Sequence, residues 1–144
     1  MDDLDATGEG RRWGAIAGVE LRKVLWRGAR WRVFDGARGL LRVAVTVGEV
    51  LSDDEVRTFH RVVANRARVV HPGLARILAC GVEDGLFYQV SALPDGPRLS
   101  QRVRSGAMLE PEIRDLIRQL AGALHAAHRL GVVVGQLTPD TLLL

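Results

Sequence analysis

Lysine, cysteine and aromatic residues are scarce in this sequence. Lys23 is the only lysine and Cys80 the only cysteine among 144 residues. A single thiol cannot close an internal disulfide, which fits a reducing compartment, and we expect Cys80 to be a small buried hydrophobic residue. Any chemistry that needs a lysine ammonium group must therefore use Lys23 or proceed without one.

Long apolar runs are also absent. No stretch of about 18 apolar residues would cross a bilayer, and the acidic start at residues 1–5 has no apolar signal-peptide core. We therefore expect a cytoplasmic domain, either free or tethered to a membrane protein in a longer parent chain.

The charge pattern is mixed rather than clustered. Charged residues make up 26% of the sequence and hydrophobic residues 47%, with a net charge of +3. These values predict a soluble globular domain. Because the arginines are interspersed with acids and not with aromatics, a solvated surface is favoured over nucleic-acid binding.

The hydrophobic pattern predicts an α+β domain whose first part is an antiparallel sheet. Apolar residues alternate with polar ones in short runs separated by turn residues, as in a meander of strands. Turns are expected at residues 26–29, 35–39 and 81–85. The five expected strands are 19–25, 31–34, 40–47, 74–80 and 86–91.

Three helices are expected. Ser52 and Glu55 form a capping box that opens a helix ended by His71-Pro72-Gly73. A short helix follows over residues 99–104, and a long one begins at Glu110-Pro111 and ends at Gly131. The residues of the first helix that we expect to face the interior are Val56, Phe59, Val63 and Val70.

The C-terminal stretch 131–144 resembles the catalytic loop of a protein kinase. The apolar frame of that loop is kept at Val132, Val133, Leu137, Pro139, Leu142 and Leu143. His71-Pro72-Gly73-Leu74, and Pro94-Asp95-Gly96 with Leu99, are similar to steps that follow the regulatory helix and the hinge. Over residues 19–144 the chain thus resembles bacterial PknB-like Ser/Thr kinases.

This resemblance implies a fold and its divisions. Residues 15–93 are expected to form a kinase-like N-lobe with a five-stranded antiparallel sheet and one regulatory helix, preceded by a flexible leader over residues 1–14. Residues 94–144 would be the hinge and a truncated C-lobe, with hinge-like positions at Ala92 and Leu93. The apolar face of the long helix would need cover, from further chain or from a second copy.

The resemblance also assigns functional positions, and most of them carry other residue types here. Of the glycine loop that covers the ATP phosphates, Gly28 and Val33 remain. Thr46 stands for the phosphate-orienting lysine and Val62 for its glutamate partner. The degenerate catalytic-loop positions are Val134, Gly135, Gln136, Thr138 and Thr141.

Phosphoryl transfer depends on positioning and electrostatic stabilisation, so these replacements predict a catalytically inactive pseudokinase. On this interpretation the chain is not an enzyme, has no catalytic residues, and binds no metal or cofactor. We expect Trp26 and Trp31 to fill the vacated cleft or to anchor a partner.

The predicted function is a protein-interaction or regulatory scaffold in bacterial Ser/Thr kinase signalling. The resemblance implies an active kinase, an FHA-type adaptor or a second copy of the chain as partner. Thr7 is the most accessible candidate phosphoacceptor; the others are Thr46, Thr58, Thr138 and Thr141. Two alternatives stay open: nucleotide or small-ligand binding without phosphate transfer, and an Arg-rich nucleic-acid-binding domain.

Overall fold

A computed structural model describes residues 14–49, 52–135 and 137–144. They form two compact units. The first, called the sheet unit, holds the described residues up to Arg61 together with 77–93. The second, called the helical unit, holds residues 62–76 and 94–144. Thr7 and Gln136 lie outside the described residues.

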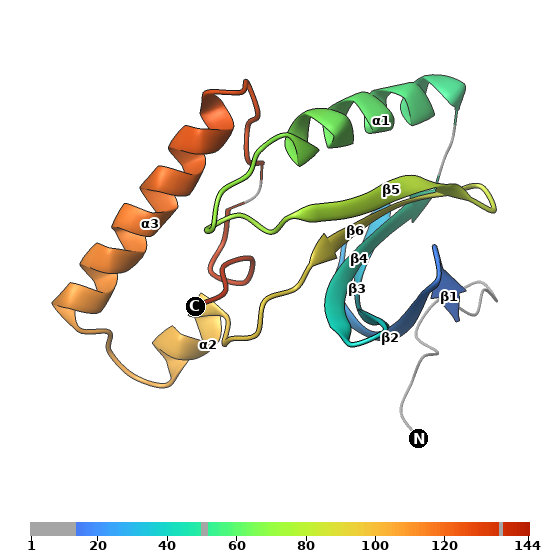
Figure 1. The fold of residues 1–144 in the computed structure, drawn as a ribbon. Coiled ribbons are helices and arrows are strands. Elements are labelled where there is room, and N and C mark those ends of the chain that lie inside the picture. The colour runs from blue at the N-terminus through green and yellow to red at the C-terminus, as the bar shows by residue number, and fades with distance from the viewer. Residues whose placement is uncertain (1–13, 50–51, 136) are drawn as a thin grey trace. The chain divides into compact units, whose positions relative to one another are not determined.

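The sheet unit is a curled antiparallel sheet (Figure 1). Its strand order is β1-β2-β3-β4-β6-β5, and each neighbouring pair is antiparallel. The strands are β1 (Ala15–Ile16), β2 (Val19–Arg27), β3 (Trp31–Arg38), β4 (Leu41–Glu49), β5 (Ile77–Glu83) and β6 (Leu86–Ala92). The α+β class with an antiparallel sheet is therefore confirmed.

The predicted number of strands is wrong by one, because the sheet has six. The additional strand, β1, is only two residues long and pairs with β2 across a turn at Ala17 and Gly18, both of which have positive φ. Two residues are too few to show an alternating pattern. Only pairing with β2 makes this segment a strand.

Strands β2, β3, β4 and β6 are also longer than the pattern predicted, and β5 is shifted by three residues from the expected 74–80, so that the expected turn at 81–85 begins only after Glu83. The expected turn at 35–39 is part of β3, which continues to Arg38, and Trp26 belongs to β2 rather than to a turn. Asp35 tolerates its place in a strand because Arg42 of β4 donates to both of its carboxylate oxygens, at distances of 2.8 to 3.3 Å. A cross-strand ion pair thus overrides the weak strand propensity of aspartate.

One face of the sheet carries the core of this unit. Phe34, Val43, Val45, Val47 and Val90 are at most 2% exposed. Alternation along β4 places its three valines on this face, so Ala44 and Thr46 lie on the opposite face. The sheet therefore separates an apolar core from the face that carries the Thr46 position.

The curl brings the two edges of the sheet together. The Ala17 amide in the β1–β2 turn donates to Oε2 of Glu83 at the end of β5, at 2.9 Å and 66 residues away. This hydrogen bond joins the β1–β2 turn, at one edge of the sheet, to the end of β5, at the other edge.

Helix α1 (Asp53–Ala67) begins as predicted, since the Ser52 hydroxyl accepts from the Glu55 amide at 3.3 Å. It ends before the expected stop at His71. The Arg68 and Val69 amides bond three residues back, to Asn65 and Arg66, which tightens and closes the last turn. The prediction that Val70 faces the interior is wrong, because its side chain is 81% exposed.

The helical unit contains α2 (Leu99–Arg104) and α3 (Glu110–His128), both of which were predicted. Gly131 has a φ of 69° just beyond α3, as expected of a residue that ends a helix. The C-terminal segment lies along α2: the Leu99 amide donates to Leu142 O and the Leu144 amide to Pro97 O. Among the described residues, no helix is long and apolar enough to cross a membrane.

Candidate functional site

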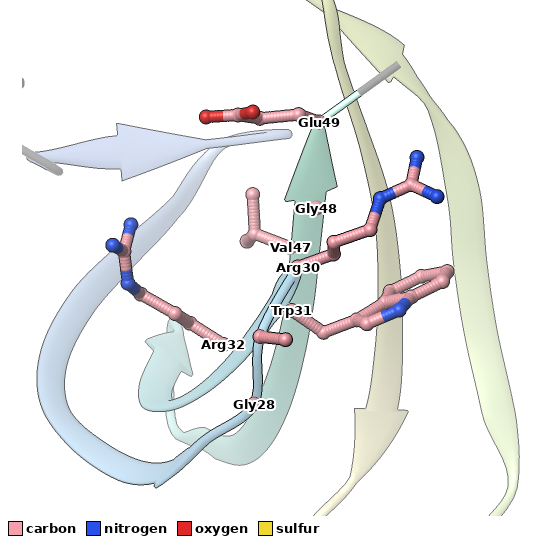
Figure 2. A pocket seen from close by; sticks show the side chains of 8 residues that line it. Gly28, Arg30, Trp31, Arg32, Val47, Gly48 and Glu49 are labelled. Atoms are coloured by element: carbon pink, nitrogen blue, oxygen red, sulfur yellow. The ribbon is translucent and has the colours of Figure 1, made fainter. Parts of the chain in front are cut away.

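The β2–β3 hairpin carries Gly28 and Val33, the two residues predicted to remain of a glycine loop. Its turn is closed by the Gly28 amide, which donates to the Trp31 carbonyl at 2.8 Å. A hollow of about 80 Å³ lies beside the turn, lined by residues 28–32 and 47–49 (Figure 2). Small-molecule sites measure roughly 300–1,000 Å³, so this hollow alone does not hold a nucleotide.

The arginines of the hollow do not converge on one point. Figure 2 shows Arg30 and Arg32 directed to opposite sides of the hairpin. Arg30 Nη2 also bonds Glu55 Oε1 of α1 at 2.9 Å. The hairpin is thus fastened to the start of α1 by an ion pair.

Trp31 belongs to a cluster of three aromatic rings between the sheet and α1. Its ring centroid lies 4.1 Å from that of Phe87 on β6, and Phe87 lies 4.7 Å from Phe59 on α1. Trp31 and Phe59 are 6.5 Å apart. Gly48 leaves the space for this packing, because a Cβ there would lie 2.3 Å from a ring carbon of Phe87.

Trp26 has a different environment. Its side chain is 43% exposed, and its ring covers Gly28, where an added Cβ would lie 2.3 Å from Cη2 of the indole. Trp26 is paired in register with Val33, the other residue predicted to remain of the glycine loop. The loop remnant is therefore covered by one half-exposed aromatic ring.

Thr46, which the resemblance predicted to stand for the phosphate-orienting lysine, is on β4. Thr46 is half-buried and pairs with Val33 on β3 and with Gln89 on β6. The chain's one lysine, Lys23, lies on β2 opposite Asp35 and is exposed. Val62, the predicted glutamate position, is 46% exposed on α1.

The hinge-like residues continue the sheet. Ala92 is the last residue of β6 and pairs with Val43, while the Leu93 amide donates to the Arg42 carbonyl at 3.3 Å. Both backbones are therefore engaged with β4.

The predicted catalytic-loop positions lie in irregular structure. Thr141 Oγ1 accepts from the Thr138 amide at 3.0 Å and donates to the Thr138 carbonyl at 2.9 Å. Asp140, in the turn that this pair closes, accepts from the Ser100 hydroxyl of α2. Val134 is half-buried and Gly135 exposed. The Thr141 hydroxyl and the contact of Asp140 with α2 therefore stabilise this turn.

The carboxylates whose pKa is shifted lie elsewhere, on α3. The Leu109 amide and then Arg102 lower the pKa of Glu112, and Arg118 and then Gln119 lower the pKa of Asp115. In the described part of the chain, no group of three or more His, Cys, Asp or Glu residues is arranged to hold a metal ion. The shifts thus reflect helix capping and surface pairing.

Sequence reasoning missed the aromatic cluster and the Arg30–Glu55 pair. Phe59 was expected to face the interior, which is one usable signal. Its partners are 28 residues away in each direction, and a sequence pattern does not reveal contacts across such separations.

Several bacterial kinases are similar to this chain in sequence. The serine/threonine-protein kinase PknE of Mycobacterium tuberculosis is 29% identical over 146 residues, which cover 97% of this chain and 26% of PknE. PkaA of Streptomyces coelicolor is 36% identical over 130 residues, covering 83% of this chain and 24% of PkaA. This chain thus spans about a quarter of the length of these relatives. No family model matches the sequence.

Solved structures show the same fold. The kinase domain of PknI from Mycobacterium tuberculosis superposes with a TM-score of 0.74 at 22% identity, over 94% of this chain and 58% of that one. The curled sheet and the helices correspond to a kinase N-lobe with part of the C-lobe.

The chain is homologous to bacterial serine/threonine protein kinases. This corrects one prediction: the chain was expected not to be an enzyme, but its relatives are named protein kinases and point to an enzyme family. The prediction was based on replacements at several assigned positions together, and the kinase relatives do not support excluding an enzyme on that basis. The functional positions assigned by resemblance stay predictions.

Proposed function

We propose that this kinase-like chain acts as a protein-recognition module in bacterial Ser/Thr kinase signalling, and that its partner is the catalytic domain of an active kinase. The single observation that carries the proposal is Trp26, which is 43% exposed above the turn of the hairpin. Tryptophan is the residue type most enriched at the energetic centres of protein interfaces.

The surroundings of Trp26 support this role. Its ring lies over Gly28, and its strand partner is Val33, so one side of the indole is already packed. A ring held on one side loses little conformational freedom when a partner covers the other side. Trp26 is thus preorganised for contact.

The β2–β3 hairpin is also fixed by contacts with β6 and α1. Trp31 packs against Phe87, and Arg30 pairs with Glu55, so both residues that follow the turn are tied to other elements. A hairpin fixed in this way presents Trp26 in one orientation. Preorganised surfaces of this kind bind with a smaller entropic cost.

The test is binding of the purified chain to an immobilised kinase domain, using those of PkaA and PknE as probes. Replacing Trp26 by Ala is expected to weaken binding about 30-fold, the effect of removing a hot-spot residue worth about 2 kcal/mol. Leu40→Ala is the matched control, because Leu40 is fully exposed in the β3–β4 turn, away from the loop remnant. Absence of binding to both probes, or equal binding by the Trp26→Ala variant, would contradict the proposal.

A second candidate function is nucleotide binding, favoured by homology to named kinases over 97% of this chain. The candidate positions are Gly28 and Val33 of the loop remnant, Thr46, and hinge-like Ala92 and Leu93. Thermal shift measurements with ATP, with and without Mg²⁺, test it, and a Thr46→Trp variant that fills the face of β4 is expected to abolish any shift. A transfer assay with γ-labelled ATP tests activity directly.

A further inference from the structure

The turn that follows α1 lies against the second half of α3, and both belong to the helical unit. A Cβ added at Gly73 would lie 3.2 Å from Cβ of Ala123, which is 1% exposed. A Cβ added at Gly122 would lie 3.6 Å from Nε2 of His71. The three residues His71-Pro72-Gly73, called the His71 turn, therefore pack on α3 where the helix carries small residues.

A side-chain hydrogen bond helps to fix the shape of the His71 turn. The Gly73 amide donates to Nδ1 of His71 at 3.0 Å, and the Leu74 amide donates to the His71 carbonyl at 3.0 Å. An imidazole nitrogen accepts a hydrogen bond only when it carries no proton. The contact with Gly73 therefore requires the neutral ring, with its single proton on Nε2.

A second proton on His71 is incompatible with this geometry. In the imidazolium form both ring nitrogens are donors, so Nδ1 and the Gly73 amide would be two donors directed at each other across 3.0 Å. The opposite edge of the ring, with Nε2 and Cε1, lies against Gly122. Protonation must therefore move the ring or the turn that it packs on.

Positive charges follow α3 on the side where the His71 turn packs. Three basic residues share a stripe of the helix with Gly122, since they are spaced three or four positions from it or from one another. They are Arg118, His125 and Arg129, and all three are exposed. The last acidic residue of α3, Asp115, is already bonded to Arg118 at 2.5 Å. This stripe would therefore repel a charged ring in the turn.

The segment that carries His71 supplies no compensating acid. Residues 56–82 and 116–139 contain no Asp or Glu. The basic residues before and after the turn, Arg66, Arg68 and Arg76, are exposed. Both segments that meet at the His71 turn thus favour the neutral imidazole.

We propose that His71 makes the contact between the end of α1 and α3 sensitive to pH. The neutral ring accepts the Gly73 amide and keeps the His71 turn on α3, whereas the protonated ring releases the turn. Because only the unprotonated ring makes the bond, its contribution to stability is present at higher pH and is lost as the pH falls. Histidine changes its charge between about pH 5 and pH 8, which is the range to be measured. This inference does not depend on the role proposed for Trp26.

Hydrogen exchange of the 144-residue chain tests the proposal, measured by mass spectrometry at about pH 8 and about pH 5. After correction for the intrinsic exchange rate, protection of peptides covering 68–76 is expected to fall about fivefold at the lower pH. This is the effect of losing one hydrogen bond worth about 1 kcal/mol. Peptides from β4 serve as the internal reference and are expected to keep their protection. Equal protection of 68–76 at both pH values would overturn the proposal.

His71→Asn separates the titration of the ring from its role as an acceptor. An asparagine side-chain oxygen accepts from the amide two residues on, and it does not titrate in this range. The variant is expected to keep the protection of 68–76 at both pH values. His128→Asn is the matched control, because His128 is exposed in the last turn of α3, and it is expected to respond as wild type does. A pH response that persists in His71→Asn, or disappears in His128→Asn, contradicts the assignment.

Nuclear magnetic resonance of the wild-type chain gives a measurement that needs no variant. The Gly73 amide resonance and the ring resonances of His71 are expected to change with pH at the same midpoint, because one hydrogen bond joins the two groups. A Gly73 resonance that stays constant while the His71 ring titrates would show that protonation leaves the turn in place.

Discussion

Two glycines determine how closely aromatic rings approach the hairpin. Gly28 lies beneath Trp26, and Gly48 lies against Phe87. At both positions an added Cβ would come within 2.3 Å of a ring carbon, a distance at which the ring must move. Glycine is needed here for space rather than for backbone freedom, since neither residue has a positive φ.

Gly48→Ala is expected to lower the free energy of unfolding by about 1–3 kcal/mol, the usual cost of overpacking a core. The reason is that Phe87 is 4% exposed and also stacks on Phe59 and Trp31, so it has little room to yield. Urea unfolding followed by circular dichroism measures the change. Gly14→Ala is the control, because nothing lies within 4 Å of its added Cβ. Equal stability of the two variants would show that Phe87 moves freely.

At the scale of elements, α1 is joined to the sheet by an aromatic cluster and one ion pair. Phe59 contributes the ring on the helix, and Phe87 and Trp31 those on the strands. The Arg30–Glu55 pair is partly exposed and contributes little by itself. The position of the helix start therefore depends mainly on ring packing.

Replacing Phe59 by Ala is expected to destabilise the chain by about 1–3 kcal/mol, since two ring contacts and the associated burial are lost. Hydrogen exchange of the amides in α1 is expected to accelerate. Arg57→Ala, which removes only an exposed pair with Asp54, is the matched control and should change little. Unchanged exchange in the Phe59→Ala variant would mean that other contacts hold the helix.

The start of α3 depends on an ionised side chain. The pKa of Glu112 is lowered, first by the Leu109 amide and then by Arg102. A lowered folded pKa means that Glu112 stabilises the folded chain fully above its ordinary value of 4.5, and that this contribution is lost as the pH falls through the lowered value.

Glu112→Gln is therefore expected to be less stable than wild type at neutral pH, with the difference shrinking as the pH falls below 4.5. Thermal unfolding at a series of pH values measures this convergence. Glu110→Gln is the control, because Glu110 bonds Arg114 but accepts no cap amide. A difference that is constant with pH would show that the Glu112 carboxylate has no special role.

At the scale of the whole molecule, burial is concentrated in the sheet unit. Strand β4 is paired on both sides, by β3 and β6, and its valines are at most 1% exposed. The helical unit contains fewer buried side chains, among them Ala123, Ala127 and Val132. The free energy of local opening is therefore expected to be higher in the sheet unit than in the helical unit.

Native-state hydrogen exchange is therefore expected to be slowest in β4 and β6 and faster in α2 and the first turns of α3. Mass spectrometry of exchanged peptides gives the comparison. Protection of 99–117 equal to that of β4 would contradict the distribution of burial.

The local elements were largely predictable. The Ser52 cap, the proline start of α3, the glycine beyond it and the alternation along β4 all predicted structure correctly, because each is a short-range effect of backbone geometry or side-chain hydrogen bonding. Val70 and the turn at 35–39 were wrong. At Val70 the last turn of α1 closes locally on Asn65 and Arg66, whereas at 35–39 cross-strand pairing outweighed the local pattern.

The candidate site was less predictable. The sequence singled out Trp26 and Trp31 together but did not distinguish them. Tertiary packing distinguishes them by their neighbours rather than by their exposure: Trp31, 39% exposed, contacts Phe87 in the aromatic cluster, and Trp26, 43% exposed, lies over Gly28. The replacements at Thr46 and Val62 remain predictions, and the exclusion of an enzyme that was drawn from them is corrected by the named kinase relatives.

The sequence by itself determined that the three helices and five of the strands exist, and the kinase-like order in which they follow, because hydrophobic periodicity and capping act within a few residues. Only the tertiary structure decided the closure of the curl at Glu83 and the aromatic cluster. Each of these depends on which distant residues meet, and that is settled by packing the whole chain at once.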